Sequence, residues 1–300
     1  MTYSGRIPVV HLVDGTYELF RYHFAVPSHV TTEGVEVAAT RGVLGSMLSL
    51  LADGATHVGV ATDRVVESFR NDLFAGYKTG EGTPPELFAQ FPLLEAALEA
   101  AGFTVFAMVA HEADDAMGAA AVRAGADPRV DAVHICTPDK DLAQVVNDAA
   151  GIAQLDRRRE VLYDRAGVVE KFGVEPTSIP DWLALVGDTA DGIPGLPGWG
   201  AKSSSVVLAR YGHLESIPAD AEEWDVPVRG AAKLAVTLVE RRDDAELYRH
   251  LATLDLEAPV MDDVEDLRWI GPADHLEAVC AHIDAPRVAE RARRLAAERA

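Results

Sequence analysis

Residues 7–14 read Ile-Pro-Val-Val-His-Leu-Val-Asp, a run of β-branched and aliphatic residues that ends in an acid. Runs of the same kind follow at 56–62, 103–109 and 132–137. Short apolar runs rich in Val and Ile, without polar alternation, are typical of strands that are buried on both faces of a parallel sheet. Between them, 36–52 and 85–101 carry apolar residues at helical spacing. The first half is therefore predicted to be α/β, with a largely parallel central sheet flanked by helices.

The second half has a different pattern. After about residue 175 the strand signals fade, and helical patterns occupy 178–186, 201–210, 231–241 and 243–251. The segment 192–200 is the densest in Gly and Pro, and it is too short for a domain linker, so it predicts a shaped turn between helices. We therefore divide the chain into an α/β core over 1–175 and a helical region over 176–300.

Composition is that of a folded enzyme. The apolar stretches are too short to span a bilayer, and the first residues lack the pattern of an export signal. The two cysteines, Cys136 and Cys280, have no zinc-ligand spacing. We expect a cytoplasmic protein with no membrane partner. The 27 basic and 48 acidic side chains give a formal charge of -21, which argues against a nucleic-acid partner unless the acids are grouped to bind cations.

Acidic side chains recur where the predicted strands end and where the Gly/Pro turn begins. They are Asp14, Asp63, Glu112, Asp114, Asp115, Asp139, Asp141, Asp188 and Asp191. The carboxyl ends of parallel strands meet at one edge of a sheet, so most of these acids should converge. Each acid alone is better explained as a turn, cap or surface residue. As a set, hard oxygen ligands without thiols predict a site for two Mg²⁺ or Mn²⁺ ions, which can hydrolyse a phosphodiester.

With these residues in hand, the sequence resembles the 5′ nuclease or flap endonuclease family, above all the N-terminal nuclease domain of bacterial DNA polymerase I. The resemblance runs from Val9 to Thr253. It rests on Leu12-Val13-Asp14-Gly15, Ser68-Phe69-Arg70 with Tyr77-Lys78, Glu112-Ala113-Asp114-Asp115, Thr137-Pro138-Asp139-Lys140-Asp141-Leu142, and Gly187-Asp188 through Asp191-Gly192-Ile193-Pro194-Gly195. It implies a PIN-like fold and a structure-specific 5′ nuclease that acts on DNA with a 5′ flap or 5′ end in replication and repair.

The resemblance also implies roles for single residues. One ion would be held by Asp14, Asp63, Glu112 and Asp114, with Asp115 close by, and a second would be held or steered by Asp139, Asp141, Asp188 and Asp191. Lys78 and Arg70 would face the scissile phosphate, and Tyr77 would be among the DNA-binding residues. A cation at such a position stabilises developing negative charge.

The Gly/Pro turn resembles a helix-three-turn-helix, which grips the duplex backbone, often with a potassium ion. The DNA-binding candidates here are Gly195, Gly198, Gly200, Lys202 and Ser203. Glycine permits close backbone approach, and the following helix N-terminus offers free N–H groups to a phosphate. A plain turn is the alternative for this segment taken alone.

The sequence departs from the family at 79–85, which reads Thr-Gly-Glu-Gly-Thr-Pro-Pro where polymerase-linked relatives carry a further basic residue. Two glycines and two prolines disfavour a continuous helix, so we expect a mobile segment in place of a basic helical arch. No polymerase pattern follows it in the chain, so a partner polymerase would be a separate protein.

Two other functions stay open. Val13-Asp14-Gly15-Thr16 and Gly187-Asp188-Thr189-Ala190-Asp191 resemble two motifs of haloacid-dehalogenase-like phosphatases, but Leu12 stands where that family needs a nucleophilic Asp. A DNA-binding relative that has lost hydrolysis is the other possibility. The sequence does not decide between exonuclease and flap cleavage, or between DNA and RNA primers.

Overall fold

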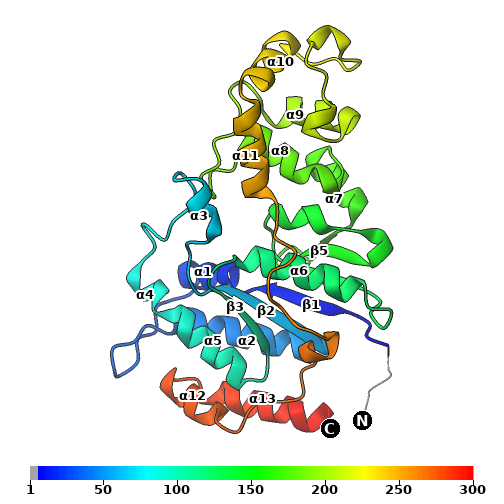
Figure 1. Cartoon of the computed structure of the whole chain (residues 1–300). Coiled ribbons are helices and arrows are strands. Elements are labelled where there is room, and N and C mark those ends of the chain that lie inside the picture. The colour runs from blue at the N-terminus through cyan, green and yellow to red at the C-terminus, as the bar shows by residue number, and fades with distance from the viewer. Residues whose placement is uncertain (1–5, 300) are drawn as a thin grey trace.

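The computed structural model describes residues 6–299 (Figure 1). Its centre is a sheet in the order β3-β2-β1-β4-β5-β6. The strands are β1 (Val10–Asp14), β2 (His57–Asp63), β3 (Thr104–Met108), β4 (Val133–Cys136), β5 (Ile152–Asp156) and β6 (Val161–Tyr163). All neighbouring pairs are parallel except β5 and β6, which form an antiparallel hairpin. The predicted α/β class and largely parallel sheet are confirmed, and β5 and β6 are additional to the four predicted strands.

Helices cover both faces of this sheet. The elements of the first half are α1 (Gly15–Ala25), α2 (Ala38–Ala52), α3 (Phe69–Leu73), α4 (Pro85–Phe88), α5 (Gln90–Ala100) and α6 (Ala113–Gly125). Successive side chains of β1 point to opposite faces, as the pleat requires. Val13 lies in the core with α2 and α5, whereas Leu12 lies in the core with α6.

The helical region stands at the carboxyl end of the sheet and has its own hydrophobic core (Figure 1). Its helices are α7 (Arg165–Phe172), α8 (Ile179–Val186), α9 (Ala201–Tyr211), α10 (Ala231–Glu240) and α11 (Arg242–Ala252). Short 3₁₀ turns complete the chain: η1 (Asp141–Val145), η2 (Asp148–Ala150), η3 (Pro176–Ser178), η4 (Leu214–Ser216), η5 (Ala221–Glu223) and η6 (Val264–Leu267). Within residues 6–299, no helix has the length and apolar character needed to cross a bilayer.

The end of the chain returns to the α/β core. Helices α12 (Leu276–His282) and α13 (Pro286–Arg299) pack against α5 and α2, and Leu276, Ala292 and Leu295 belong to the same hydrophobic cluster as Val13. The packing therefore differs from the predicted division, in which 176–300 formed one helical unit. An amphipathic helix shows that it has a partner, but its sequence does not say which surface that partner is.

Candidate metal centre

The first acids of the site lie at the ends of two central strands. Asp14 caps α1 and accepts hydrogen bonds from the Tyr17 backbone N–H at 2.7 Å and from Thr137 Oγ1 at 2.9 Å. Asp63 accepts from the Ala113 backbone N–H at 2.7 Å. Burial raises the pKa of Asp14 to about 7, and the nearby charges of Asp63 and Asp139 add to the shift. Buried carboxylates held this close favour a bound cation.

Glu112 joins these acids to the basic side of the site. It precedes α6, accepts a hydrogen bond from Ser68 Oγ at 2.7 Å, and lies 2.6 Å from Lys78 Nζ. The same ammonium lies 2.9 Å from Asp191 Oδ1. Burial by itself would raise the pKa of Glu112, but the cations of Lys78 and Arg70 lower it below its ordinary value. Lys78 therefore bridges acids from two distant parts of the chain.

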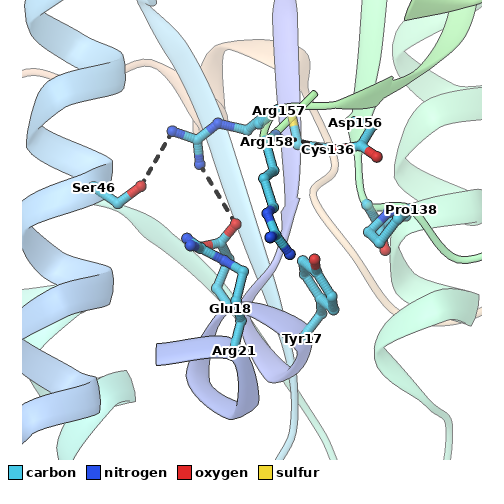
Figure 2. A pocket seen from close by; sticks show the side chains of 10 residues that line it. Tyr17, Glu18, Arg21, Ser46, Cys136, Pro138, Asp156, Arg157 and Arg158 are labelled. Carbon is cyan, nitrogen blue, oxygen red and sulfur yellow. Dashed lines mark hydrogen bonds and ion pairs between the residues drawn. The ribbon is translucent and has the colours of Figure 1, made fainter. Parts of the chain in front are cut away.

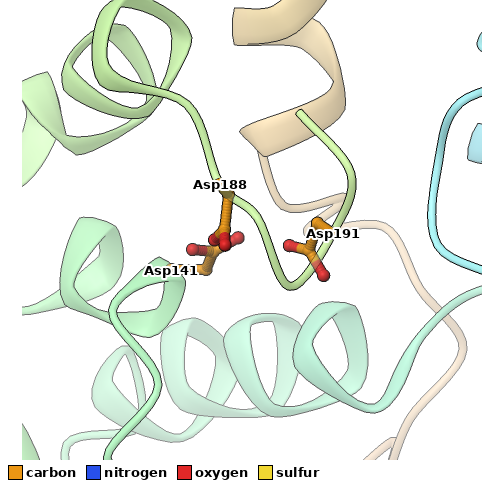
Figure 3. Close-up of side chains that lie close together, drawn as sticks. All are labelled: Asp141, Asp188 and Asp191. Carbon is orange, nitrogen blue, oxygen red and sulfur yellow. The ribbon is translucent and has the colours of Figure 1, made fainter. Parts of the chain in front are cut away.

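A second group of acids gathers beside α8 (Figure 3). Ligand oxygens of Asp141, Asp188 and Asp191 all lie within 4.8 Å of one another. Paired backbone hydrogen bonds of 2.8 Å between Asp188 and Ile193 close the loop that turns Asp191 back toward the others. Asp141 Oδ1 is buried and has no hydrogen-bond partner within residues 6–299. Burial and the neighbouring acids raise the pKa of Asp141 well above its ordinary value.

Members of both predicted ligand groups line one cleft of about 410 Å³. Asp14, Asp63, Asp114, Asp139 and Asp191 all line it. Burial raises the pKa of Asp114 well above its ordinary value, and the charges of Asp139 and Asp14 raise it further. The structure thus brings both predicted ligand groups together, and their donors are all carboxylate oxygens, which suit Mg²⁺ or Mn²⁺.

Arg70 does not lie where the sequence interpretation expected it. Its side chain is 3% exposed, and each of its five N–H groups is used. Two donate to Asp115, one to Glu112, and one each to the carbonyl oxygens of Leu251 and Thr253. Arg70 therefore fixes the positions of Glu112 and Asp115, and it has no N–H group left to contact the scissile phosphate.

Asp115 and Tyr77 also differ from expectation. Asp115 is fully buried, and both of its oxygens accept hydrogen bonds from Arg70 and from the backbone N–H groups of Glu112 and Asp255. Tyr77 is 4% exposed and directs its hydroxyl to Glu112 at 3.3 Å. Both side chains support the site from within the protein, so we no longer expect Asp115 to ligate an ion or Tyr77 to contact DNA.

Lys140 also contributes to the site, although the sequence analysis gave it no role. Lys140 lies between two acids of its motif and contacts Asp188 Oδ2 at 2.5 Å. This ion pair neutralises part of the charge of the second group, as the ion pair between Lys78 and Asp191 also does. Its position in the sequence, between the two candidate ligands Asp139 and Asp141, was the signal that could have identified it.

The Gly/Pro turn has the backbone that its sequence predicts. Gly195 has φ 71°, and a Cβ placed there would lie 2.6 Å from Val186 C, so the turn packs directly on the end of α8. Gly200 begins α9, and Ser203 Oγ accepts from its N–H at 3.1 Å. Lys202 is exposed on the first turn of α9, and Gly198 has φ 85°. Gly198, Gly200, Lys202 and Ser203 therefore lie together at a partly exposed helix start, whereas Gly195 is buried against α8.

The segment 79–85 runs without a helix until α4 begins at Pro85, as its glycines and prolines predict. Thr79 and Thr83 line the acidic cleft, and Glu81 is exposed. The segment therefore borders the site, and its mobility remains a prediction.

Residues 9–173 match the family described as 5′-3′ exonuclease, N-terminal resolvase-like domain. Residues 174–275 match 5′-3′ exonuclease, C-terminal SAM fold. This chain belongs to the 5′-3′ exonuclease family. The resemblance identified from its motifs is confirmed, and with it the class of 5′-3′ exonuclease. The phosphatase interpretation falls because both family matches lie outside that class.

Known relatives agree with this assignment. A 5′-3′ exonuclease of Aquifex aeolicus is 30% identical over 261 residues, covering 86% of each chain. DNA polymerase I of Pseudomonas aeruginosa is 37% identical over 254 residues, which are 83% of this chain and 27% of that enzyme. The chain thus spans less than a third of the length of its polymerase relatives.

The fold also has solved counterparts. The flap endonuclease of bacteriophage T5, in a complex with DNA and metal ions, superposes with a TM-score of 0.63 at 19% identity, covering 96% of this chain and 99% of that chain. This likeness supports the sheet with its helical region as the fold of the family.

Proposed function

We propose that this chain is a structure-specific 5′ nuclease that hydrolyses DNA at 5′ flaps and 5′ ends with two Mg²⁺ or Mn²⁺ ions. The observation that carries the proposal is the single cleft in which acids from two sets of elements converge around Lys78. The first ion would be held by Asp14, Asp63, Glu112 and Asp114, and the second by Asp139, Asp141, Asp188 and Asp191. The buried, unpartnered oxygen of Asp141 fits this assignment, because a cation would satisfy it.

Bound divalent ions supply Lewis acidity at a phosphate and lower the pKa of water. The side chains of this chain supply the rest. Glu112 and Asp191 hold the Lys78 ammonium at the cleft, where it can contact a non-bridging phosphate oxygen and stabilise developing charge. Arg70 fixes Glu112 and Asp115 in place, and Lys140 fixes Asp188.

The helical region would bind the duplex without reading its sequence. Lys202 and the N–H groups at the start of α9 face solvent, where phosphate contacts can form. The proposal includes a K⁺ ion that would lie between the backbone of the glycine turn before α9 and a DNA phosphate. In the DNA polymerase I relatives a similar chain is part of a larger protein, so we propose a DNA polymerase as the partner. We also propose that the protein acts in the cytoplasm.

The test is cleavage of a labelled 5′-flap DNA with Mg²⁺ or Mn²⁺ and with chelator. We expect metal-dependent cleavage by the wild type, and no cleavage but retained flap binding by Asp188→Asn. The exposed Asp53→Asn is the matched control and should cleave normally. A wild type that binds the flap but does not cut it with either ion would make the chain a DNA-binding relative without hydrolytic activity.

A further inference from the structure

A second, smaller cavity lies between α1, α2 and the β5–β6 hairpin. Its volume is about 170 Å³, below the size of an ordinary small-molecule site, so it suits one small group with a few waters. Tyr17 lines both this cavity and the acidic cleft. Thr137, which donates to Asp14, also lines the cavity. Whatever fills the cavity is therefore next to the metal centre.

The cavity is rich in guanidinium groups although the chain as a whole is acidic. Arg157 and Arg158 come from the turn after β5, and Arg21 comes from α1 (Figure 2). The hairpin turn is held by Asp156, whose Oδ1 accepts the backbone N–H groups of Arg158 at 3.1 Å and Arg159 at 3.0 Å. Two consecutive arginines thus line the cavity.

The charges inside the cavity are not balanced by its own acids. The Glu18 carboxylate pairs with Arg21 and is 4.0 Å from Arg157. Asp156 is occupied by the turn. Arg158 has no hydrogen bond or ion pair from its guanidinium within residues 6–299, and it lies beside Tyr17 in Figure 2.

Two buried arginine N–H groups at the cavity have no hydrogen-bond acceptor within residues 6–299. Arg157 donates from Nη2 to Ser46 Oγ at 3.2 Å, but its Nη1 has no acceptor in the part of the chain that is described. The same is true of Arg21 Nε. Buried N–H groups of charged side chains normally have partners, and the planar fork of arginine matches the oxygens of a phosphate.

We propose that this cavity is an anion subsite that binds one phosphate group beside the catalytic cleft through Arg157, Arg158 and Arg21. The inference rests on the proposed nuclease function for its biological ligand, because a phosphate there would belong either to the bound DNA or to free phosphate. The donors are the Arg158 guanidinium and the N–H groups at Arg157 Nη1 and Arg21 Nε, which have no hydrogen-bond acceptor within residues 6–299. Tyr17 separates this phosphate from the one at the metal centre.

The experiment compares Arg158→Gln and Arg157→Gln with Arg159→Gln. Arg159 is the matched control, since it comes from the same turn, is 72% exposed and does not line the cavity. Binding of a labelled 5′-flap DNA is measured in chelator at about 50 and about 200 mM salt. Loss of one phosphate contact should lower the salt slope by about 1, so the advantage of the wild type over Arg158→Gln should shrink about threefold between these salts. Arg158 makes no contact that folding needs, so this variant stays informative even if Arg157→Gln does not fold.

A second arm measures the rise in Tm that inorganic phosphate alone gives to each protein. A lower salt slope in Arg158→Gln but not in the control assigns the subsite to DNA. An unchanged slope with loss of the phosphate-dependent rise in Tm assigns it to free phosphate. Equal slopes in all proteins without such a rise, or an equal loss in Arg159→Gln, would overturn the proposal. Failure of the wild type to cleave contradicts only the nuclease function, because binding is read in chelator.

Discussion

Replacing Arg70 with alanine tests whether this side chain orders the site or touches the substrate. Arg70 is 2% exposed and donates five hydrogen bonds, to two buried acids and two backbone carbonyls. In Arg70→Ala the fully buried Asp115 loses its cation. Removing one partner of a buried ion pair costs about 3–5 kcal/mol, because the remaining charge stays buried and unpaired.

The expected change in melting temperature follows from this cost. An unfolding entropy of about 2 cal/mol/K per residue gives roughly 600 cal/mol/K for a chain of this length, so about 4 kcal/mol lowers the Tm by about 7 °C. The Leu251 and Thr253 carbonyls join the end of α11 to Arg70, so the helical region should loosen together with the acids. Activity should then fall in parallel with the folded fraction.

The assay is thermal unfolding followed by circular dichroism, alongside cleavage of the labelled flap at a temperature where the variant is folded. Arg210→Ala is the control, because Arg210 is an exposed arginine with one exposed partner, Asp225, and its loss should leave the Tm unchanged. An Arg70→Ala protein that keeps its Tm within about 1 °C but loses cleavage would refute the reasoning. That result would return Arg70 to the scissile phosphate.

Three further predictions follow from the same contacts. Asp141→Asn should raise the Tm of the metal-free protein, because it removes a carboxyl group whose ionised form burial and the neighbouring acids destabilise, and should lower cleavage by more than about 100-fold; unfolding with and without Mg²⁺ and a flap assay measure both. The pKa of Asp14 is raised from 3.8 to about 7, so the folded state binds a proton that the unfolded state has lost. In chelator, the contribution of Asp14 to stability should be full below pH 4 and fall by at most about 4 kcal/mol as the pH rises to 7, whereas saturating Mg²⁺ should reverse this contribution. Urea unfolding of the wild type and of Asp14→Asn at several pH values measures the difference. Gly192→Ala places a Cβ 2.1 Å from Gly76 O at φ 76° and should lower kcat by displacing Lys78, whereas Gly34→Ala, at φ 85° with no neighbour within 4 Å, should cost only backbone strain of about 1–3 kcal/mol and leave kcat unchanged.

Much of the fold was readable because buried parallel strands are continuous apolar runs. The β5–β6 hairpin was not found, since β5 carries Gln154 and Asp156 and β6 is short and largely exposed. The acids after the predicted strands were found by a rule that needs only strand ends, namely that these ends meet at one edge, whereas Asp188 and Asp191 were placed at the end of a helix and joined to the site by the family resemblance. Sequence spacing was sufficient for that step.

The surroundings of Arg70 could not be inferred in the same way. Its acceptors on Leu251 and Thr253 are 181 and 183 residues away along the chain, and they exist only because α11 ends beside α3. Whether a guanidinium faces a ligand or a buried carboxylate depends on such packing. A motif names the residue, but tertiary contacts decide which group it meets.

Lys78 would explain how so acidic a chain could bind the proposed DNA substrate. Its ammonium contacts one carboxylate from each acid group, at 2.6 and 2.9 Å, while its backbone N–H donates to the Asp191 carbonyl at 2.9 Å. A divalent ion that binds Glu112 or Asp191 competes with Lys78 for the same oxygens, since each carboxylate has few lone pairs. Filling the site with ions therefore frees the ammonium for a phosphate at the moment when the acids are neutralised. The charge of -21 would in this way be partly cancelled at the cleft, and the contact between Lys78 and a phosphate would depend on metal, whereas contacts elsewhere on the chain would not.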